Sequence, residues 1–161
     1  MATERQHAAL PYVVCNGEVE VLLITSRDTQ RWVIPKGWPK KKMTAYELAA
    51  LEAYEEAGLQ GEIDEVPLGD YHYIKRLKGD EETLVRVDVY PLLVESQLLD
   101  WPEKGQRQLN WVRPEQAARM VDEKELSLLL KVFRAEKAKS RRAGLVSSVT
   151  NAVKRLLIRA V

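Results

Sequence analysis

The sequence has very little of several residue types that build specialised sites. Cys15 is the only cysteine among 161 residues, which excludes an intrachain disulfide and a zinc site made of cysteines. Only two histidines are present, His7 and His72, and neither has the partners of a catalytic triad. No apolar run approaches the roughly 20 residues that a membrane-spanning helix needs. We therefore expect a protein with no integral membrane segment.

The chain also lacks the usual marks of a targeted or disordered protein. Its first ten residues do not show the basic-then-apolar order of a secretory signal. Hydrophobic residues make up 45% of the chain and charged residues 30%, an ordinary globular balance. The length is typical of one domain. These features predict a single globular body in the cytoplasm.

Charge is distributed unevenly along the chain, although the net charge is only +1. Residues 131–161 carry nine Lys or Arg and one Glu, a net of +8, so the rest of the chain has a net of −7. We expect a domain over residues 1–138 and a basic tail over residues 139–161. The tail has apolar residues at helical spacing, namely Leu145, Val149, Val153, Leu156 and Leu157.

A basic amphipathic helix of this kind can bind an anionic membrane or a protein partner. The alternative, which we favour, is that its apolar stripe packs on the body or on a second copy of the chain. The second of these arrangements would be a homodimer.

Local patterns predict an α+β fold. Asn16-Gly17 is a favoured hairpin turn between two segments rich in β-branched residues. We expect strands at 10–15, 19–25, 31–34, 69–76, 83–94 and 108–112, a loop at 35–43, and helices at 45–57, 114–121 and 123–138. Because strands and helices do not alternate regularly, a parallel βαβ fold is not expected.

The helix at 45–57 has clear signals at both ends. Thr44 and Glu47 form the capping-box pattern at its start, in which each side chain bonds the backbone N–H of the other residue. Gly58 suits the left-handed position that commonly ends a helix.

This helix also carries acidic residues without basic ones. Glu52, Glu55 and Glu56 fall within an arc of about 100° on its surface, and the helix contains no Lys or Arg. They lie in its C-terminal half, where the helix dipole disfavours anions. An acidic surface helix is one interpretation. A site for Mg²⁺, or alternatively Mn²⁺, is the other, since both ions prefer oxygen ligands.

The segment around this helix resembles the Nudix box. That motif is Gly, five residues, Glu, seven residues and then Arg-Glu-U-x-Glu-Glu-x-Gly-U, where U is a bulky aliphatic residue. Counted from Gly37, the spacing matches Glu52, Glu55, Glu56 and Gly58. The resemblance covers residues 10 to about 135, and implies a Nudix fold with a mixed β-sheet between helices.

Two positions differ from the motif. Met43 stands where the motif has its first Glu, and Leu51 where it has Arg. In the family these two charged residues are thought to tie the loop to the helix. We expect Met43 and Leu51 to replace that ion pair with an apolar contact.

The resemblance implies roles for the motif residues. Glu52 and Glu56 would bind Mg²⁺, with the Gly37 carbonyl as a further ligand. Glu55 would accept the proton of the attacking water or serve as another metal ligand. The implied reaction is hydrolysis of a P–O–P linkage.

The subgroup most similar to this sequence is that of the diphosphoinositol and diadenosine polyphosphate hydrolases. It shares Ser26-Arg27 and Arg31-Trp32 before the box, and Trp101-Pro-Glu103 and Arg107 with Trp111 after it. The resemblance implies a phosphate-rich small-molecule substrate, and the expected substrate-binding residues are Ser26, Arg27, Arg31, Lys36 and Arg107.

Two other functions remain open. Because Met43 and Leu51 depart from the motif, the chain could be a Nudix-fold binding module with impaired catalysis. A tail-directed adaptor for nucleic acid or a membrane is the third interpretation, and we do not favour a nucleic-acid partner. The three retained glutamates favour the enzyme, because a binding module would have little use for them.

Overall fold

The computed structural model describes residues 3–140, with side chains up to Phe133. The elements along the chain are β1 (Thr3–Cys15), β2 (Glu18–Thr25), β3 (Trp32–Val33), β4 (Lys36–Gly37), α1 (Ala45–Ala57), β5 (Leu59–Ile63), β6 (Gly69–Arg76), β7 (Glu82–Gln97), β8 (Leu109–Val112), α2 (Pro114–Met120) and α3 (Lys124–Ser140). None of the described helices is long and apolar enough to cross a membrane.

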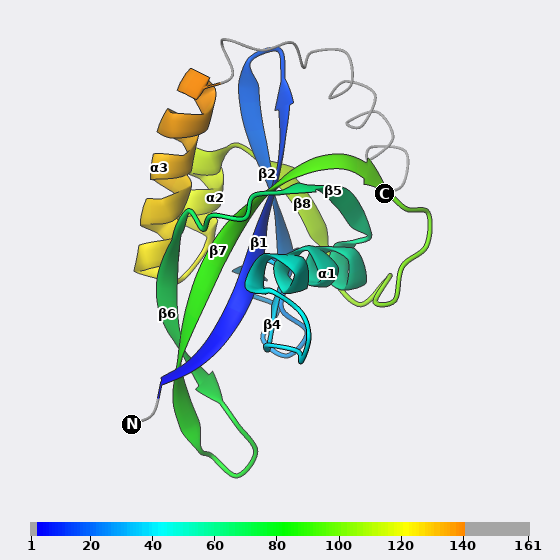
Figure 1. The fold of residues 1–161 in the computed structure, drawn as a ribbon. Helices are drawn as coiled ribbons and strands as arrows, with labels where there is room; N and C mark the ends of the chain where they lie inside the picture. The colour runs from blue at the N-terminus through cyan, green and yellow to red at the C-terminus, as the bar shows by residue number, and fades with distance from the viewer. Residues whose placement is uncertain (1–2, 141–161) are drawn as a thin grey trace.

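The sheet is built around β1 and β7, which run parallel to each other from Thr3↔Leu84 to Tyr12↔Leu93. The other pairings are antiparallel. On the edge of β1 that faces away from β7, β4 pairs with the first half of β1 and β2 pairs with its second half. On β7, β6 and β5 likewise divide the outer edge. The sheet is therefore mixed, and its edge strands diverge from a central pair (Figure 1).

Helices cover both faces of this sheet, as Figure 1 shows. On one face, the alanines of α1 pack against residues of β1, β2 and β7 in one buried cluster. On the other face, α2 and α3 contribute to a second cluster. The expected α+β architecture, with a mixed sheet between helices, is confirmed.

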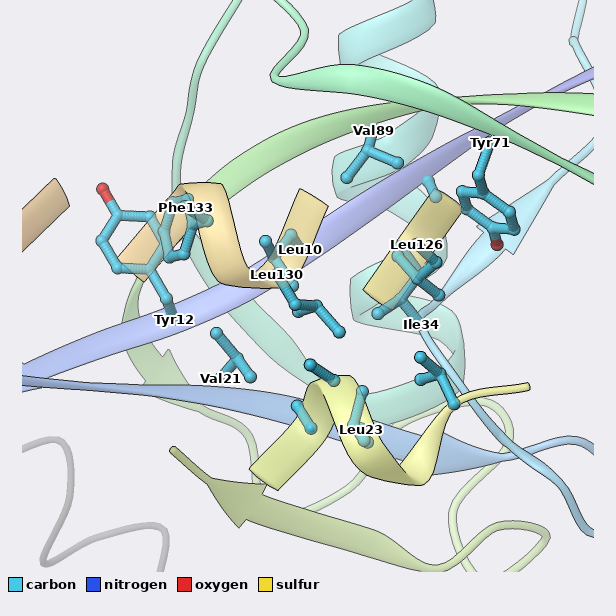
Figure 2. Close-up of a cluster of buried hydrophobic side chains, with 14 of the residues drawn as sticks. Leu10, Tyr12, Val21, Leu23, Ile34, Tyr71, Val89, Leu126, Leu130 and Phe133 are labelled. Carbon is cyan, nitrogen blue, oxygen red and sulfur yellow. The ribbon is translucent and has the colours of Figure 1, made fainter. Parts of the chain in front are cut away.

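Figure 2 shows the cluster under α3. Leu126 and Leu130 of the helix share this cluster with Leu10 of β1, and all three are at most 1% exposed. Phe133 packs edge-on against Tyr12 with 4.9 Å between ring centroids. Burying side chains of this size contributes roughly 1.5–3 kcal/mol each, which fixes α3 on the sheet.

The hairpin turn and the helix at 45–57 are confirmed at the expected residues. Asn16 and Gly17 both have positive φ, 51° and 77°, as a two-residue hairpin turn requires. The first strand, however, begins at Thr3 and not at residue 10. The strands β4 and β5 lie where the sequence predicts no strand. The expected tail continues α3 as far as Ser140, and the rest of it, 141–161, lies outside the described residues.

Candidate active site

The helix α1 is fixed at both ends by the bonds that its sequence predicts. The Thr44 backbone N–H donates to Glu47 Oε2 at 2.8 Å, and the Glu47 N–H donates to Thr44 Oγ1 at 3.3 Å. At the other end, Gly58 adopts φ 69° and donates its N–H to the Tyr54 carbonyl at 2.9 Å. These bonds satisfy backbone groups that a helix end leaves unpaired.

The two faces of α1 serve different purposes. Ala49, Ala53 and Ala57 are fully buried against the sheet, and their small side chains let the helix approach closely. On the other side, Glu52 and Glu56 are only 8% and 7% exposed. The Glu55 side chain, 32% exposed, lies closer to solvent. The helix therefore holds two nearly buried carboxylates and one accessible carboxylate beside each other.

Gly37 lies against the first of these carboxylates. It belongs to β4, and its pairing with His7 of β1 fixes the position of its backbone. A Cβ added at residue 37 would overlap the Glu52 carboxyl group. A larger residue at this position would force the Glu52 carboxyl group to move, so Gly37 and Glu52 lie in close contact.

These residues line a cleft of about 710 Å³. Seven of the eight candidate residues with a charged or polar side chain, together with Gly37, lie in its wall: Ser26, Arg27, Lys36, Glu52, Glu55, Glu56 and Arg107. Sequence positions from 26 to 107 are thus brought together by α1, β4 and the loops around them. The cleft combines carboxylates with cationic side chains, as a site for a metal and a phosphate group would require.

Arg31 is the expected site residue that the structure does not bring to the cleft wall. Its Nη1 lies 3.3 Å from Asp122 Oδ2 and 3.4 Å from Glu123 Oε1, both between α2 and α3. Its backbone N–H donates to the Ser26 hydroxyl at 3.2 Å. Arg31 is therefore paired with acidic groups of the chain itself, and its expected role in substrate binding stays a prediction.

The carboxylates of α1 do have cationic partners, which come from outside the helix. Arg107 Nη2 donates to Glu56 Oε1 at 3.1 Å and to Glu103 Oε1 at 3.3 Å. Lys40 Nζ lies 3.6 Å from Glu55 Oε1. Although α1 itself has no Lys or Arg, Glu55 and Glu56 are each paired with a basic side chain from another part of the protein. As placed, no three His, Cys, Asp or Glu side chains within residues 3–133 converge to hold a metal ion.

The electrostatics of the cleft still favour an added cation. Burial raises the pKa of Glu56 to about 7, although Arg107 and Lys36 act in the opposite direction. Burial also raises the pKa of Glu52, and the neighbouring Glu55 adds to this effect. Both anions are therefore costly in this arrangement. An oxygen-only donor set of this kind suits Mg²⁺ or Mn²⁺, which would have to compete with Arg107 for Glu56.

The wall contributed by β1 and β6 is not predicted from the sequence. Gln6, Tyr73 and Lys75 line the cleft, and the Tyr73 hydroxyl donates to Gln6 Oε1 at 2.7 Å. The Lys36 ammonium lies 5.3 Å from the centre of the Tyr73 ring. Burial lowers the pKa of Lys36, against the opposing effect of Glu56. No local pattern marks these strand residues, because only the β1–β7–β6 pairing brings them to β4.

Three further residues of the motif segment, Trp38, Met43 and Leu51, are also placed. The Trp38 side chain is 38% exposed, and Lys75 Nζ lies 4.9 Å from its ring centre, so the loop contacts β6 at the cleft. Met43 is 37% exposed and Leu51 is half-buried. Their expected apolar contact stays a prediction.

Comparison with known proteins shows which family the chain resembles. A model of the NUDIX domain matches residues 5–132. Nudix hydrolase 12, mitochondrial, of Arabidopsis thaliana is 32% identical over 103 residues, which are 62% of this chain and 51% of that protein. Diphosphoinositol polyphosphate phosphohydrolase 3-alpha of Homo sapiens is 31% identical over 107 residues, 65% of this chain and 61% of that protein. The matches to Nudix hydrolases 12, 16 and 18 of Arabidopsis thaliana each span about half of the relative's length.

Solved structures show the same fold at lower identity. The crystal structure of C. elegans Ap4A hydrolase superposes with a TM-score of 0.60 at 22% identity, covering 84% of this chain and 99% of that one. E. coli dihydroneopterin triphosphate pyrophosphohydrolase gives a TM-score of 0.60 at 15% identity with the same coverages. Since the NUDIX model matches well over half of the chain and the fold agrees, this chain belongs to the Nudix family.

Proposed function

We propose that this protein hydrolyses a P–O–P linkage in a phosphate-rich small molecule and that the reaction depends on Mg²⁺. The observation that carries the proposal is that Gly37, Glu52, Glu55 and Glu56 line one cleft that also holds cationic side chains, with Gly37 against the Glu52 carboxyl group. Pyrophosphate hydrolysis needs both a metal site and groups that bind phosphate oxygens.

Glu52, Glu56 and the Gly37 carbonyl are the proposed metal ligands. Their oxygen chemistry fits Mg²⁺, or Mn²⁺ as an alternative, and burial makes both carboxylates favour a cation partner. A bound divalent ion would lower the pKa of a water molecule and neutralise charge on the phosphate oxygens.

Glu55 is the proposed acceptor for the proton of the attacking water. Its side chain is 32% exposed at the cleft, so it can reach both solvent and substrate. Lys40, its partner at 3.6 Å, is an exposed residue that can exchange this contact for a phosphate. Glu55 could instead serve as another metal ligand, since a carboxylate suits both roles.

The proposed substrate carries several phosphates, as in a dinucleoside polyphosphate or a diphosphoinositol polyphosphate. Arg27, Lys36 and Lys75 add positive charge to the cleft wall, and each further phosphate gives these side chains another partner. Similarity to a human diphosphoinositol polyphosphate phosphohydrolase supports this class. We retain the expected cytoplasmic location as part of the proposal.

The alternative is a Nudix-fold binding module with impaired catalysis, which Met43 and Leu51 favour. A substrate panel separates the two functions. Wild-type protein is incubated with a dinucleoside polyphosphate, a diphosphoinositol polyphosphate and an ADP-sugar, with and without Mg²⁺, and the products are identified by mass.

The proposal predicts Mg²⁺-dependent cleavage of a P–O–P bond, with the longer polyphosphates preferred. Binding of these compounds without any cleavage would favour the binding module. Preference for the ADP-sugar would contradict the proposed substrate class and leave the reaction type intact.

A further inference from the structure

The loop between β7 and β8 is attached directly to the C-terminal end of α1. The Leu98 N–H donates to the Gly58 carbonyl at 2.9 Å, and Gln97 Nε2 donates to the Ala57 carbonyl at 3.0 Å. The Glu103 N–H donates to the Glu55 carbonyl at 3.0 Å. These carbonyls belong to the helix end, which cannot pair them within the helix.

An aromatic contact fixes the same loop on the helix. Trp101 is only 9% exposed, and its ring lies over Gly58, where an added Cβ would come within 2.5 Å of ring atom Cε3. Loop and helix are therefore attached by three backbone carbonyls and one buried ring. The position of Glu103 relative to Glu55 and Glu56 is set by this attachment.

The Glu103 side chain joins two arginines of the cleft through one oxygen. Its Oε1 lies 3.2 Å from Arg27 Nη1 and 3.3 Å from Arg107 Nη2. The Glu103 side chain is 19% exposed, the Arg27 side chain 58% and the Arg107 side chain 8%. Glu103 thus links an exposed cation, Arg27, to a buried cation, Arg107, on the wall beside the α1 carboxylates.

We propose that Glu103 is a positioning residue that holds Arg27 and Arg107 where they meet substrate phosphates. This inference deepens the proposed function and rests on it for the identity of the ligand. Without Glu103, Arg27 keeps only its 3.3 Å contact with Gln106 Oε1 in the described structure. Arg107 would then be left with Glu56 and the Thr25 carbonyl.

Removing the charge of Glu103 should change anion binding in the direction opposite to the one that charge alone predicts. Removing a negative charge from a cleft that takes an anion should strengthen anion binding by Coulomb attraction. If Glu103 instead acts by orienting two arginines, its removal weakens binding, because each freed guanidinium must be ordered again when the anion binds.

The test measures binding of inorganic tripolyphosphate by calorimetry at fixed salt and without Mg²⁺. Glu103→Gln should weaken binding about fivefold, since it removes two charge-assisted contacts. The control is Glu65→Gln, at an exposed acidic residue outside the cleft wall, which should leave binding unchanged. Unchanged or tighter binding in Glu103→Gln would overturn the proposal.

A second variant shows whether Glu103 acts through Arg27. Arg27→Ala should weaken tripolyphosphate binding, and adding Glu103→Gln to it should cost less than it costs the wild-type protein. Fully additive losses, or no loss in Arg27→Ala, would count against the proposal even if Glu103→Gln proved unstable. Thermal unfolding of each variant checks the fold, which the backbone bond of Glu103 should preserve.

Failure of the proposed hydrolase function and failure of the positioning role of Glu103 give different results. If the substrate panel shows no P–O–P cleavage by the wild-type protein but Glu103→Gln still weakens tripolyphosphate binding, the hydrolase proposal fails and the positioning role stands. If cleavage occurs and KM for a long polyphosphate is the same in wild-type and Glu103→Gln protein, the positioning role fails alone.

Discussion

Replacing Arg107 with methionine should destabilise the protein in a way that Mg²⁺ can partly reverse. The side chains of Arg107 and of its partner Glu56 are 8% and 9% exposed. Arg107→Met keeps most of the side-chain volume but removes the guanidinium. The Glu56 carboxylate is then left in a buried place without its nearest cation.

The size of the effect follows from this burial. Breaking a buried ion pair by removing one partner costs about 3–5 kcal/mol. We expect a loss near the lower limit, about 3 kcal/mol, because Glu103 keeps Arg27 as a partner at 3.2 Å. For a chain of this length, that loss lowers Tm by roughly 6–12 °C.

The assay is urea unfolding of wild-type and variant protein, with and without excess Mg²⁺. A cation on Glu56 would replace the missing positive charge, and binding to the folded state alone adds stability. The loss in Arg107→Met should therefore be smaller with Mg²⁺ than without it.

The matched control is Arg113→Met. Arg113 lies 2.9 Å from Glu18, but both side chains are more than 60% exposed, so this variant should lose less than about 1 kcal/mol. An equal loss for the two variants would refute the argument from burial. A loss in Arg107→Met that is the same with and without Mg²⁺ would refute the claim that metal and guanidinium compete for Glu56.

Two further predictions concern the supporting structure. Gly58→Ala should lower the free energy of unfolding by about 2–4 kcal/mol, because φ is 69° and the new Cβ would meet the Trp101 ring. The control Gly79→Ala, with φ 79° and no atom within 4 Å of the new Cβ, should lower it by only about 1 kcal/mol. Equal losses for the two variants in denaturant unfolding would contradict this prediction. The His72 backbone N–H lowers the pKa of Glu125 from 4.5 in the folded state. The resulting stability is present above that pH and is lost as pH falls through the folded-state value. Glu125→Gln should therefore unfold slightly more easily than wild type at pH 7, by less than about 1 kcal/mol. A difference that persists undiminished at pH 3 would contradict this.

Local signals in the sequence are enough to predict α1 and the first hairpin. Thr44 with Glu47, Gly58, and Asn16-Gly17 each specify their own backbone geometry through bonds or torsions within a few residues. The same holds for the acidic face of α1, since the helical period alone places its glutamates together.

Elements that depend on distant partners could not be predicted in this way. The segment before residue 10 becomes part of β1 because it pairs with β7, some eighty residues later. The strand β4 has two residues and exists only through its bonds to His7 and Ala8. The strand β5 contains Gly61 and polar residues, and its extended form follows from pairing with β7.

The same distinction holds for the site. Spacing from Gly37 predicts which glutamates share the cleft, but not that Arg107, 51 residues from Glu56, lies within 3.1 Å of it. Nor does spacing show that Arg31 is paired with Asp122 and Glu123. Tertiary packing decides which acidic side chain a basic residue pairs with. A basic residue close in sequence to the Nudix box is therefore a weaker indication of substrate binding than a glutamate within the box is of metal binding.

The central claim is that the acidic face of α1 holds a metal for hydrolysis of P–O–P bonds. Its most direct test is the Mg²⁺ dependence of product formation by Glu56→Gln, measured beside wild-type protein and Glu62→Gln. Glu62 is an exposed acidic residue of β5 outside the cleft wall. We predict Mg²⁺-dependent turnover in wild type and Glu62→Gln, and none in a folded Glu56→Gln variant. Turnover in Glu56→Gln with the Mg²⁺ dependence of wild type would contradict the claim.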